Sequence, residues 1–217
     1  MNTTYQFCFI RILFILCLGI SSGSLLASDN YSIAPVDSNE TGSVIREIMV
    51  QTQYSPTSYV FLGKTPNSSS HRYSLGMVFS NRMRLLNTDF LYSVRWHPYL
   101  SYHYSKRDQG GRLDTVHGWA FDPLGLVKYK SLNKSTYLET AFYGGFAYVS
   151  SHFPTDKGRS LNFTFEGQVY LKQVLDSKYI LSLGTSYHHI SNAQTGKENP
   201  GIDSLYLIAK ISYLFTQ

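Results

Sequence analysis

The chain has 217 residues, a formal net charge of +5 and two cysteines, Cys8 and Cys17. Both cysteines lie near the N-terminus, so residues 28–217 have no disulfide, no thiolate metal site and no cysteine nucleophile. The positive excess is too small to favour nucleic acid as a partner. Aromatic residues are abundant, at 15% of the chain, with 18 tyrosines and 13 phenylalanines.

The N-terminal segment has the features of a secretory signal peptide. Arg11 precedes an apolar run over residues 12–20, which is too short to span a bilayer as a helix. Small residues follow, and we expect cleavage after Ala27, so that residues 1–27 are the signal peptide. Loss of Arg11, the single charge in this segment, leaves a net charge of +4. Residues 28–43 are polar and are expected to form a leader without a core.

Alternating, aromatic-rich segments of about ten residues follow the leader, a pattern typical of outer-membrane β-barrels. In the segment 160–175, Leu161 and Phe163 alternate with Asn162 and Thr164. We assign the apolar face to lipid and the polar face to the lumen. Eight strands are predicted, near residues 44–54, 72–85, 89–104, 116–130, 136–150, 160–175, 179–191 and 203–215.

The predicted fold class is therefore all-β, an eight-stranded antiparallel transmembrane β-barrel of the bacterial outer membrane over residues 44–217. Eight strands suffice to close the smallest such barrel, whose interior is filled by side chains. A short turn is expected at Asn87 and Thr88, and Pro98 and Pro123 predict bulges within their strands. The connections after the first, third, fifth and seventh strands are long, so we place them outside the cell.

The last two strands carry the residues that indicate chemistry. His189 and Ser191 have the same parity as Leu181 and Leu183, and Asp203 has the parity of Leu205. If the two strands pair, a histidine, a serine and an acid meet on one apolar outward face near the extracellular end. These are the components of a nucleophile, its base and the group that orients the base. Asn192, Asn199 and the backbone near Gly201 could donate hydrogen bonds to an oxyanion.

The sequence resembles a known family at this point. His189-Ile190-Ser191-Asn192-Ala193, followed by Asn199-Pro200-Gly201-Ile202-Asp203, is similar to the signature of the lipid A 3-O-deacylases of PagL type. Upstream, the likeness includes Gly144-Gly145-Phe146, residues 151–154 and 162–165, and Asp122-Pro123-Leu124-Gly125. It covers roughly residues 45–215, and the motif pair around His189 and Asp203 is its most specific part.

The resemblance implies a barrel that hydrolyses an ester-linked acyl chain of lipid A without a metal or other cofactor. His189 would be the general base, Ser191 the nucleophile and Asn199 the oxyanion donor, with Asn192 as the second candidate. Asp203 stands where the best-known members carry glutamate, and its side chain is one methylene shorter. The substrate would be lipid A in the surrounding outer-membrane lipid. Whether the barrel forms a homodimer stays open at this level.

Basic residues of the predicted outer loops are candidates for contact with lipid A phosphates. The alternative is ordinary solvated loop charge. His188 has the opposite parity to His189 and is expected to hydrogen-bond in the lumen. Glu139 and Glu166 are expected to join an internal polar network there with Lys172 and Lys210. Two other functions stay open at this level: a non-enzymatic structural or adhesive barrel, and an acyltransferase. The phosphate candidates are Lys106, Arg107, Arg112, Lys157, Arg159 and Lys197.

Overall fold

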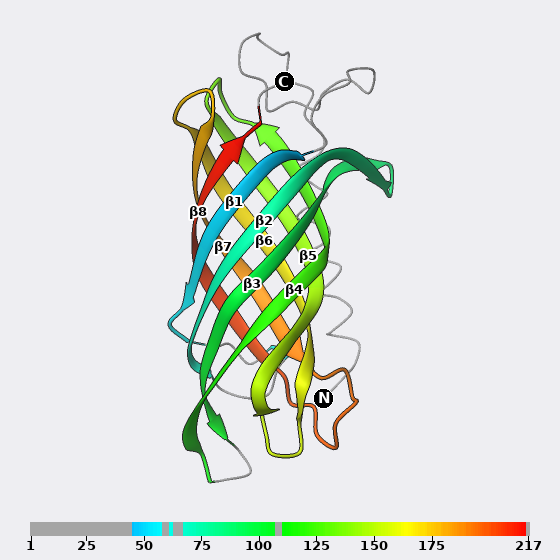
Figure 1. Ribbon diagram of the computed structural model, residues 1–217, viewed down its shortest axis with the longest axis vertical. Coiled ribbons are helices and arrows are strands. Elements are labelled where there is room, and N and C mark those ends of the chain that lie inside the picture. The colour runs from blue at the N-terminus through cyan, green and yellow to red at the C-terminus, as the bar shows by residue number, and fades with distance from the viewer. Residues whose placement is uncertain (1–44, 58–60, 63–66, 107–109, 216–217) are drawn as a thin grey trace.

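The computed structural model describes residues 45–57, 61–62, 67–106 and 110–215. Eight antiparallel strands close into a barrel in which each strand pairs with its neighbours in sequence and β1 pairs with β8 (Figure 1). The strands are β1 (Ile45–Ser55), β2 (Asn67–Leu85), β3 (Thr88–Lys106), β4 (Arg112–Ser131), β5 (Thr136–Phe153), β6 (Arg159–Val174), β7 (Tyr179–Ser191) and β8 (Ile202–Leu214). The predicted fold is confirmed. The expected signal peptide and leader, residues 1–43, lie outside the described residues, as does Arg107.

Alternation along the strands separates the two faces of the wall as predicted. On β6, Leu161, Phe163, Val169 and Leu171 are exposed on the outside, whereas the side chains between them are buried in the lumen. On β7, the odd-numbered residues point outward and the even-numbered residues other than Gly184 are buried. The apolar face is therefore the outer one, the reverse of a soluble β-sandwich.

Several element boundaries differ from the prediction. The turn between β2 and β3 consists of Leu86 and Asn87, both with positive φ, and Thr88 already belongs to β3. Two successive residues with positive φ give a turn whose twist matches that of the flanking strands. β2 begins at Asn67, before the predicted Arg72, and the hairpin of β3 and β4 extends further from the barrel than expected (Figure 1).

The prolines mark irregular pairing, as predicted. The register between β3 and β4 shifts between His97 and Leu100, around Pro98, and the register between β4 and β5 shifts between Phe121 and Leu124, around Pro123. Gly145 lies opposite the second shift, and a Cβ there would come within 2.3 Å of the Phe121 carbonyl oxygen and 2.4 Å of Asp122 Oδ1. The glycine is therefore required by the close approach of β4 and its buried Asp122.

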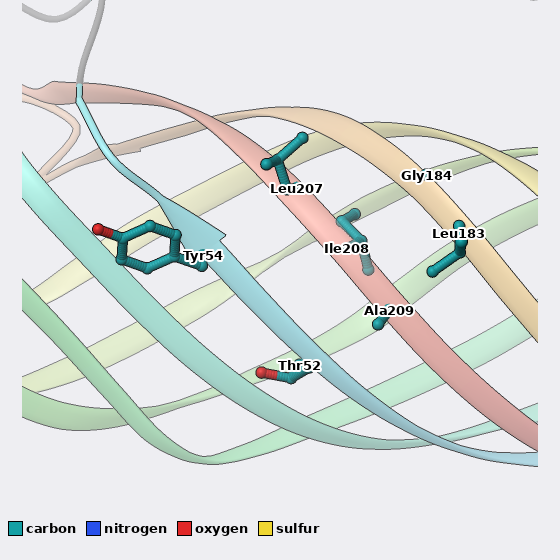
Figure 2. Close-up of a pocket in the computed structure, with 7 residues that line it drawn as sticks. All are labelled: Thr52, Tyr54, Leu183, Gly184, Leu207, Ile208 and Ala209. Atoms are coloured by element: carbon teal, nitrogen blue, oxygen red, sulfur yellow. The ribbon is translucent and has the colours of Figure 1, made fainter.

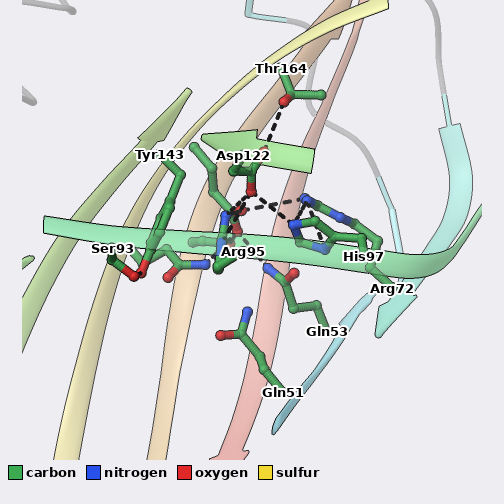
Figure 3. Close-up of polar contacts among 12 residues, drawn as sticks. Gln51, Gln53, Arg72, Ser93, Arg95, His97, Asp122, Tyr143 and Thr164 are labelled. Atoms are coloured by element: carbon green, nitrogen blue, oxygen red, sulfur yellow. Dashed lines mark hydrogen bonds and ion pairs between the residues drawn. The ribbon is translucent and has the colours of Figure 1, made fainter. Parts of the chain in front are cut away.

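A charged network fills the middle of the lumen (Figure 3). Arg95 Nη2 lies 2.7 Å from both Asp122 Oδ2 and Glu166 Oε2, and Arg72 Nη1 lies 3.4 Å from Glu166 Oε2. His97 Nε2 is 2.8 Å from Asp122 Oδ2. All five side chains are buried. Buried charges are tolerated only when paired and hydrogen-bonded, so these contacts must form together.

A second network lies on the side of the lumen where β1 begins. Lys172 contacts Glu47 at 2.8 Å and Glu139 at 3.0 Å, and Lys210 contacts Glu139 at 2.7 Å. Glu139 thus pairs with both lysines as predicted. Glu166 does not pair with either lysine. It precedes Lys172 on β6, nearer the opposite end of the lumen, and pairs with Arg72 and Arg95 instead.

The opposite end of the lumen is apolar. Ten buried side chains, each no more than 1% exposed, pack there. They are Leu100, Tyr102, Tyr104, Val116, Ala120, Ala147, Val149, Phe153, Ile190 and Ile202. This end carries the connections that follow β3, β5 and β7, at the lower end of Figure 1. The described lumen is therefore a packed interior at this end.

None of the described segments forms a helix long and apolar enough to cross a membrane.

Candidate active site

Pairing of β7 with β8 places His189 directly opposite Asp203. The distance from His189 Nδ1 to Asp203 Oδ1 is 2.7 Å. Directly opposed residues in an antiparallel pair have neighbouring Cβ atoms, so the short aspartate side chain reaches the ring without a further methylene. His189 is partly accessible, with 17% of its side chain exposed. This leaves Nε2 as the ring nitrogen through which His189 could act as a base.

The second oxygen of the Asp203 carboxylate is bound by the backbone that follows β1. Phe61 N and Leu62 N donate to Asp203 Oδ2 at 2.9 and 2.6 Å. Asp203 has outward parity, yet it is fully buried, at 0% exposed. The sequence did not predict these two donors, because every residue except proline carries a backbone N–H and the residue type does not reveal which one is used.

Ser191 lies two residues beyond His189 on the same outward face and is partly exposed. Residues i and i+2 of a strand are about 6.6 Å apart, so the serine hydroxyl is within reach of the imidazole through side-chain rotation. Within the described part of the chain, no hydrogen bond joins the side chains of Ser191 and His189. Catalytic hydrogen bonds often tighten only when substrate binds.

The two asparagines have different surroundings in the connection between β7 and β8. Asn192 is buried; its Nδ2 donates to Glu198 O at 2.7 Å, and its backbone oxygen accepts from Thr195. Asn199 Oδ1 accepts from Asn192 N at 2.8 Å. A backbone N–H can bond only to the amide oxygen, so the Nδ2 group of Asn199 is turned away from this contact and can donate elsewhere. Asn192 therefore shapes the loop that orients Asn199.

Of the basic candidates, three lie together beside the loop 192–201. Lys157 Nζ pairs with Glu198 at 3.0 Å, Arg159 Nε donates to Thr195 O at 3.1 Å, and Lys197 N donates to Lys157 O at 3.1 Å. These contacts join the β5–β6 and β7–β8 connections. The Lys197 side chain is exposed.

Lys106 and Arg112 lie on the projecting β3–β4 hairpin, apart from that group. Lys106 Nζ contacts Asp156 at 2.9 Å and Asp114 at 3.0 Å. The hydrogen bond that Lys106 Nζ donates to Asp156, with a further one to Asp114, raises the pKa of Lys106. Lys106 is therefore neutralised by two acids, whereas Arg112 is exposed at the start of β4.

His188 lies in the lumen as predicted, but it packs there without the expected hydrogen bond. Its ring centroid is 6.4 Å from that of Tyr102 and 5.8 Å from that of Tyr206. Neither ring nitrogen has a hydrogen-bond partner among the described residues. Nor do three or more metal-binding side chains come together anywhere in the described ranges.

An apolar groove of about 330 Å³ lies on the outward face of β1, β7 and β8 (Figure 2). It is lined by Thr52, Tyr54, Leu183, Gly184, Leu207, Ile208 and Ala209. Leu207 is four residues from Asp203 on β8, about 13 Å along the strand. The groove therefore lies on the same strands as the pair of His189 and Asp203, further along the wall.

Comparison with known proteins places this geometry in a family. The sequence model of the lipid A 3-O-deacylases (PagL) matches residues 70–212. The chain belongs to the lipid A 3-O-deacylase (PagL) family. Its members are ester hydrolases, so the chain belongs to a family of enzymes. No curated protein matches the sequence.

Solved structures support the fold at low sequence identity. The crystal structure of the outer membrane enzyme PagL has a TM-score of 0.51 and 18% identity, covering 76% of this chain and 97% of that one. Neisserial surface protein A (NspA) has a TM-score of 0.51 and 13% identity, covering 81% of this chain and 100% of that one. The protein is thus an eight-stranded outer-membrane β-barrel.

Proposed function

We propose that this protein hydrolyses the 3-O-linked acyl ester of lipid A, with Ser191 as nucleophile, His189 as general base and Asp203 as the residue that orients the base. The observation that carries the proposal is the 2.7 Å contact between His189 Nδ1 and Asp203 Oδ1, with Ser191 next on the same outward face. Membership of the lipid A 3-O-deacylase family supplies the substrate class and the reaction.

The reaction begins with transfer of the Ser191 proton to His189 Nε2. The serine oxygen bonds to the ester carbon, and the carbonyl oxygen becomes an oxyanion that Asn199 Nδ2 can stabilise. The bond from carbon to the sugar oxygen then breaks, and that oxygen takes the proton from His189. Water hydrolyses the acyl-serine in the same way and releases a fatty acid. Asp203 keeps the imidazole in the tautomer that accepts at Nε2.

The site is proposed to work from the outer leaflet. An eight-stranded barrel has an interior only wide enough for its own side chains, and here charged and apolar residues occupy it. A lipid A molecule standing beside the wall would present its ester to Ser191 and one acyl chain to the groove of Figure 2. Lys157 and Arg159 contact the loop 192–201, and Lys197 lies within it. We propose these three residues as phosphate contacts; Arg112, Lys106 and Arg107 are further candidates.

Mass spectrometry of lipid A tests the proposal directly. Purified protein in detergent is incubated with lipid A, and the product masses are compared with those from Ser191→Ala. Loss of one ester-linked acyl chain with wild type alone is the expected result. An unchanged spectrum would contradict hydrolysis, and a gain of mass with a phospholipid donor present would indicate an acyltransferase instead.

A further inference from the structure

Hydrogen bonds reach the carboxylate of Asp203 from His189 and also from two backbone groups outside the β7–β8 hairpin. His189 occupies Oδ1, whereas Phe61 N and Leu62 N both donate to Oδ2. β1 is hydrogen-bonded to β8, with Tyr54 opposite Leu207. β1 is therefore the direct neighbour of the strand that carries Asp203.

An acidic side chain on the outward face of a membrane barrel needs such partners. A carboxylate facing lipid without hydrogen bonds would lose its hydration at large cost. Backbone N–H groups bonded to an ionised oxygen form short, charge-assisted hydrogen bonds. Because both donors take the same oxygen, they also restrict rotation about the Cβ–Cγ bond and hold Oδ1 toward His189.

Aromatic contacts hold this backbone in place. The Phe61 ring is 6.2 Å from the Tyr187 ring in an edge-to-face arrangement, and Tyr187 is 5.8 Å from Phe165. Phe165 in turn lies 6.3 Å from the His189 ring. Such aromatic pairs contribute beyond their buried area. Phe61 and Leu62 are thus fixed against the strands that bear the proposed catalytic residues.

We propose that Phe61 and Leu62 are positioning residues whose backbone N–H groups fix Asp203 for catalysis, so that these two residues complete the active site. The inference rests on the proposed function of Asp203. It adds a requirement for two backbone donors, Phe61 N and Leu62 N, that lie outside the β7–β8 motif. It also accounts for a buried acid at an outward position.

The test compares Leu62→Pro with Leu62→Ala. Proline removes the N–H that lies 2.6 Å from Asp203 Oδ2, whereas alanine keeps it and changes only the side chain. Removing one hydrogen bond to a charged group predicts a kcat about 10- to 100-fold lower for Leu62→Pro with little change in KM. Leu62→Ala keeps the N–H and should therefore lose much less activity than Leu62→Pro. Equal activity of the two variants would overturn the proposal.

The second arm asks whether the proline acts through the carboxylate. In an Asp203→Ala background, Leu62→Pro should reduce the rate no further, because the group it orients is gone. An undiminished loss in that background would overturn the proposal. Heat-modifiable gel mobility establishes that each variant is folded. Phe61→Ala, which weakens the contact with Tyr187, gives an independent variant and should also lower kcat.

A second readout separates this inference from the proposed function. A fluorophosphonate probe bonds to Ser191 Oγ with loss of fluoride, and its rate reports activation of the serine whatever the natural substrate is. If wild type reacts at Ser191 but leaves lipid A intact, the proposed function fails and the labelling rates of the two Leu62 variants decide the inference. If wild-type Ser191 does not react, Asp203 has no base to orient, and the inference is overturned.

Discussion

His188 and His189 are adjacent in sequence and lie in opposite environments. His188 points into the lumen between Tyr102 and Tyr206 and makes no hydrogen bond through its ring nitrogens to any described residue. His189 points outward and is hydrogen-bonded to Asp203. Because successive side chains of a strand point to opposite faces, one of these two adjacent rings packs in the lumen and the other is a candidate base. On the proposed function, the outer face of the wall carries the chemistry, whereas the inner face contributes to stability.

The largest expected effect is the loss of activity on the outer face. Ser191→Ala should lower deacylation by roughly 10³-fold or more, because the nucleophile is removed. The fold should be unaffected, since a serine hydroxyl contributes little to a strand on the outer face. Lipid A mass spectra and gel mobility of the purified variant measure both. Continued trimming by folded Ser191→Ala would remove Ser191 from the mechanism.

Replacing Asp203 should have a smaller but still large effect. Asp203→Asn keeps the shape of the side chain and removes the negative charge that stabilises the imidazolium, so kcat should fall by about 10²–10⁴-fold. Asp203→Glu serves as the control, and it should retain much more activity because the carboxylate is kept. An asparagine variant as fast as wild type would exclude Asp203 as the orienting residue.

On the inner face, substitution should affect stability and leave the chemistry intact. Glu166→Ala leaves Arg95 and Arg72 without one of their buried partners, which predicts a loss of about 3–5 kcal/mol in the free energy of unfolding. Denaturant titration of the refolded protein measures this loss. The matched control is Val169→Ala on the outer face of the same strand. A large fall in kcat of folded Glu166→Ala would mean that the two faces are not independent.

The smallest effect is expected at His188. His188→Phe keeps an aromatic ring between the two tyrosines and removes no hydrogen bond to a described side chain, so stability should change by less than about 1.5 kcal/mol. Activity should stay within a few-fold of wild type. The same substitution at His189 should remove nearly all activity. Similar losses at both positions would contradict the division between the two faces.

The sequence predicts this division well, because side-chain alternation has a period of two and a single apolar face sets the register. It placed His189 and Ser191 on one outward face and Glu139 with Lys172 and Lys210. The pairing partner of Glu166 was missed, since alternation identifies the face of a residue and not its height relative to distant strands. The contacts of Phe61 and Leu62 with Asp203 were missed for another reason: their donors are backbone groups.

The apolar cluster at the outer end of the lumen affects the cell as well as the protein. Tyr102, Tyr104 and Phe153 pack there with no accessible surface, so the described side chains fill this end of the lumen. Barrels of this kind should conduct no ions in a planar bilayer. A bacterium could then carry many copies of a lipid-modifying protein in its outer membrane without admitting the small hydrophilic antibiotics that enter through porins.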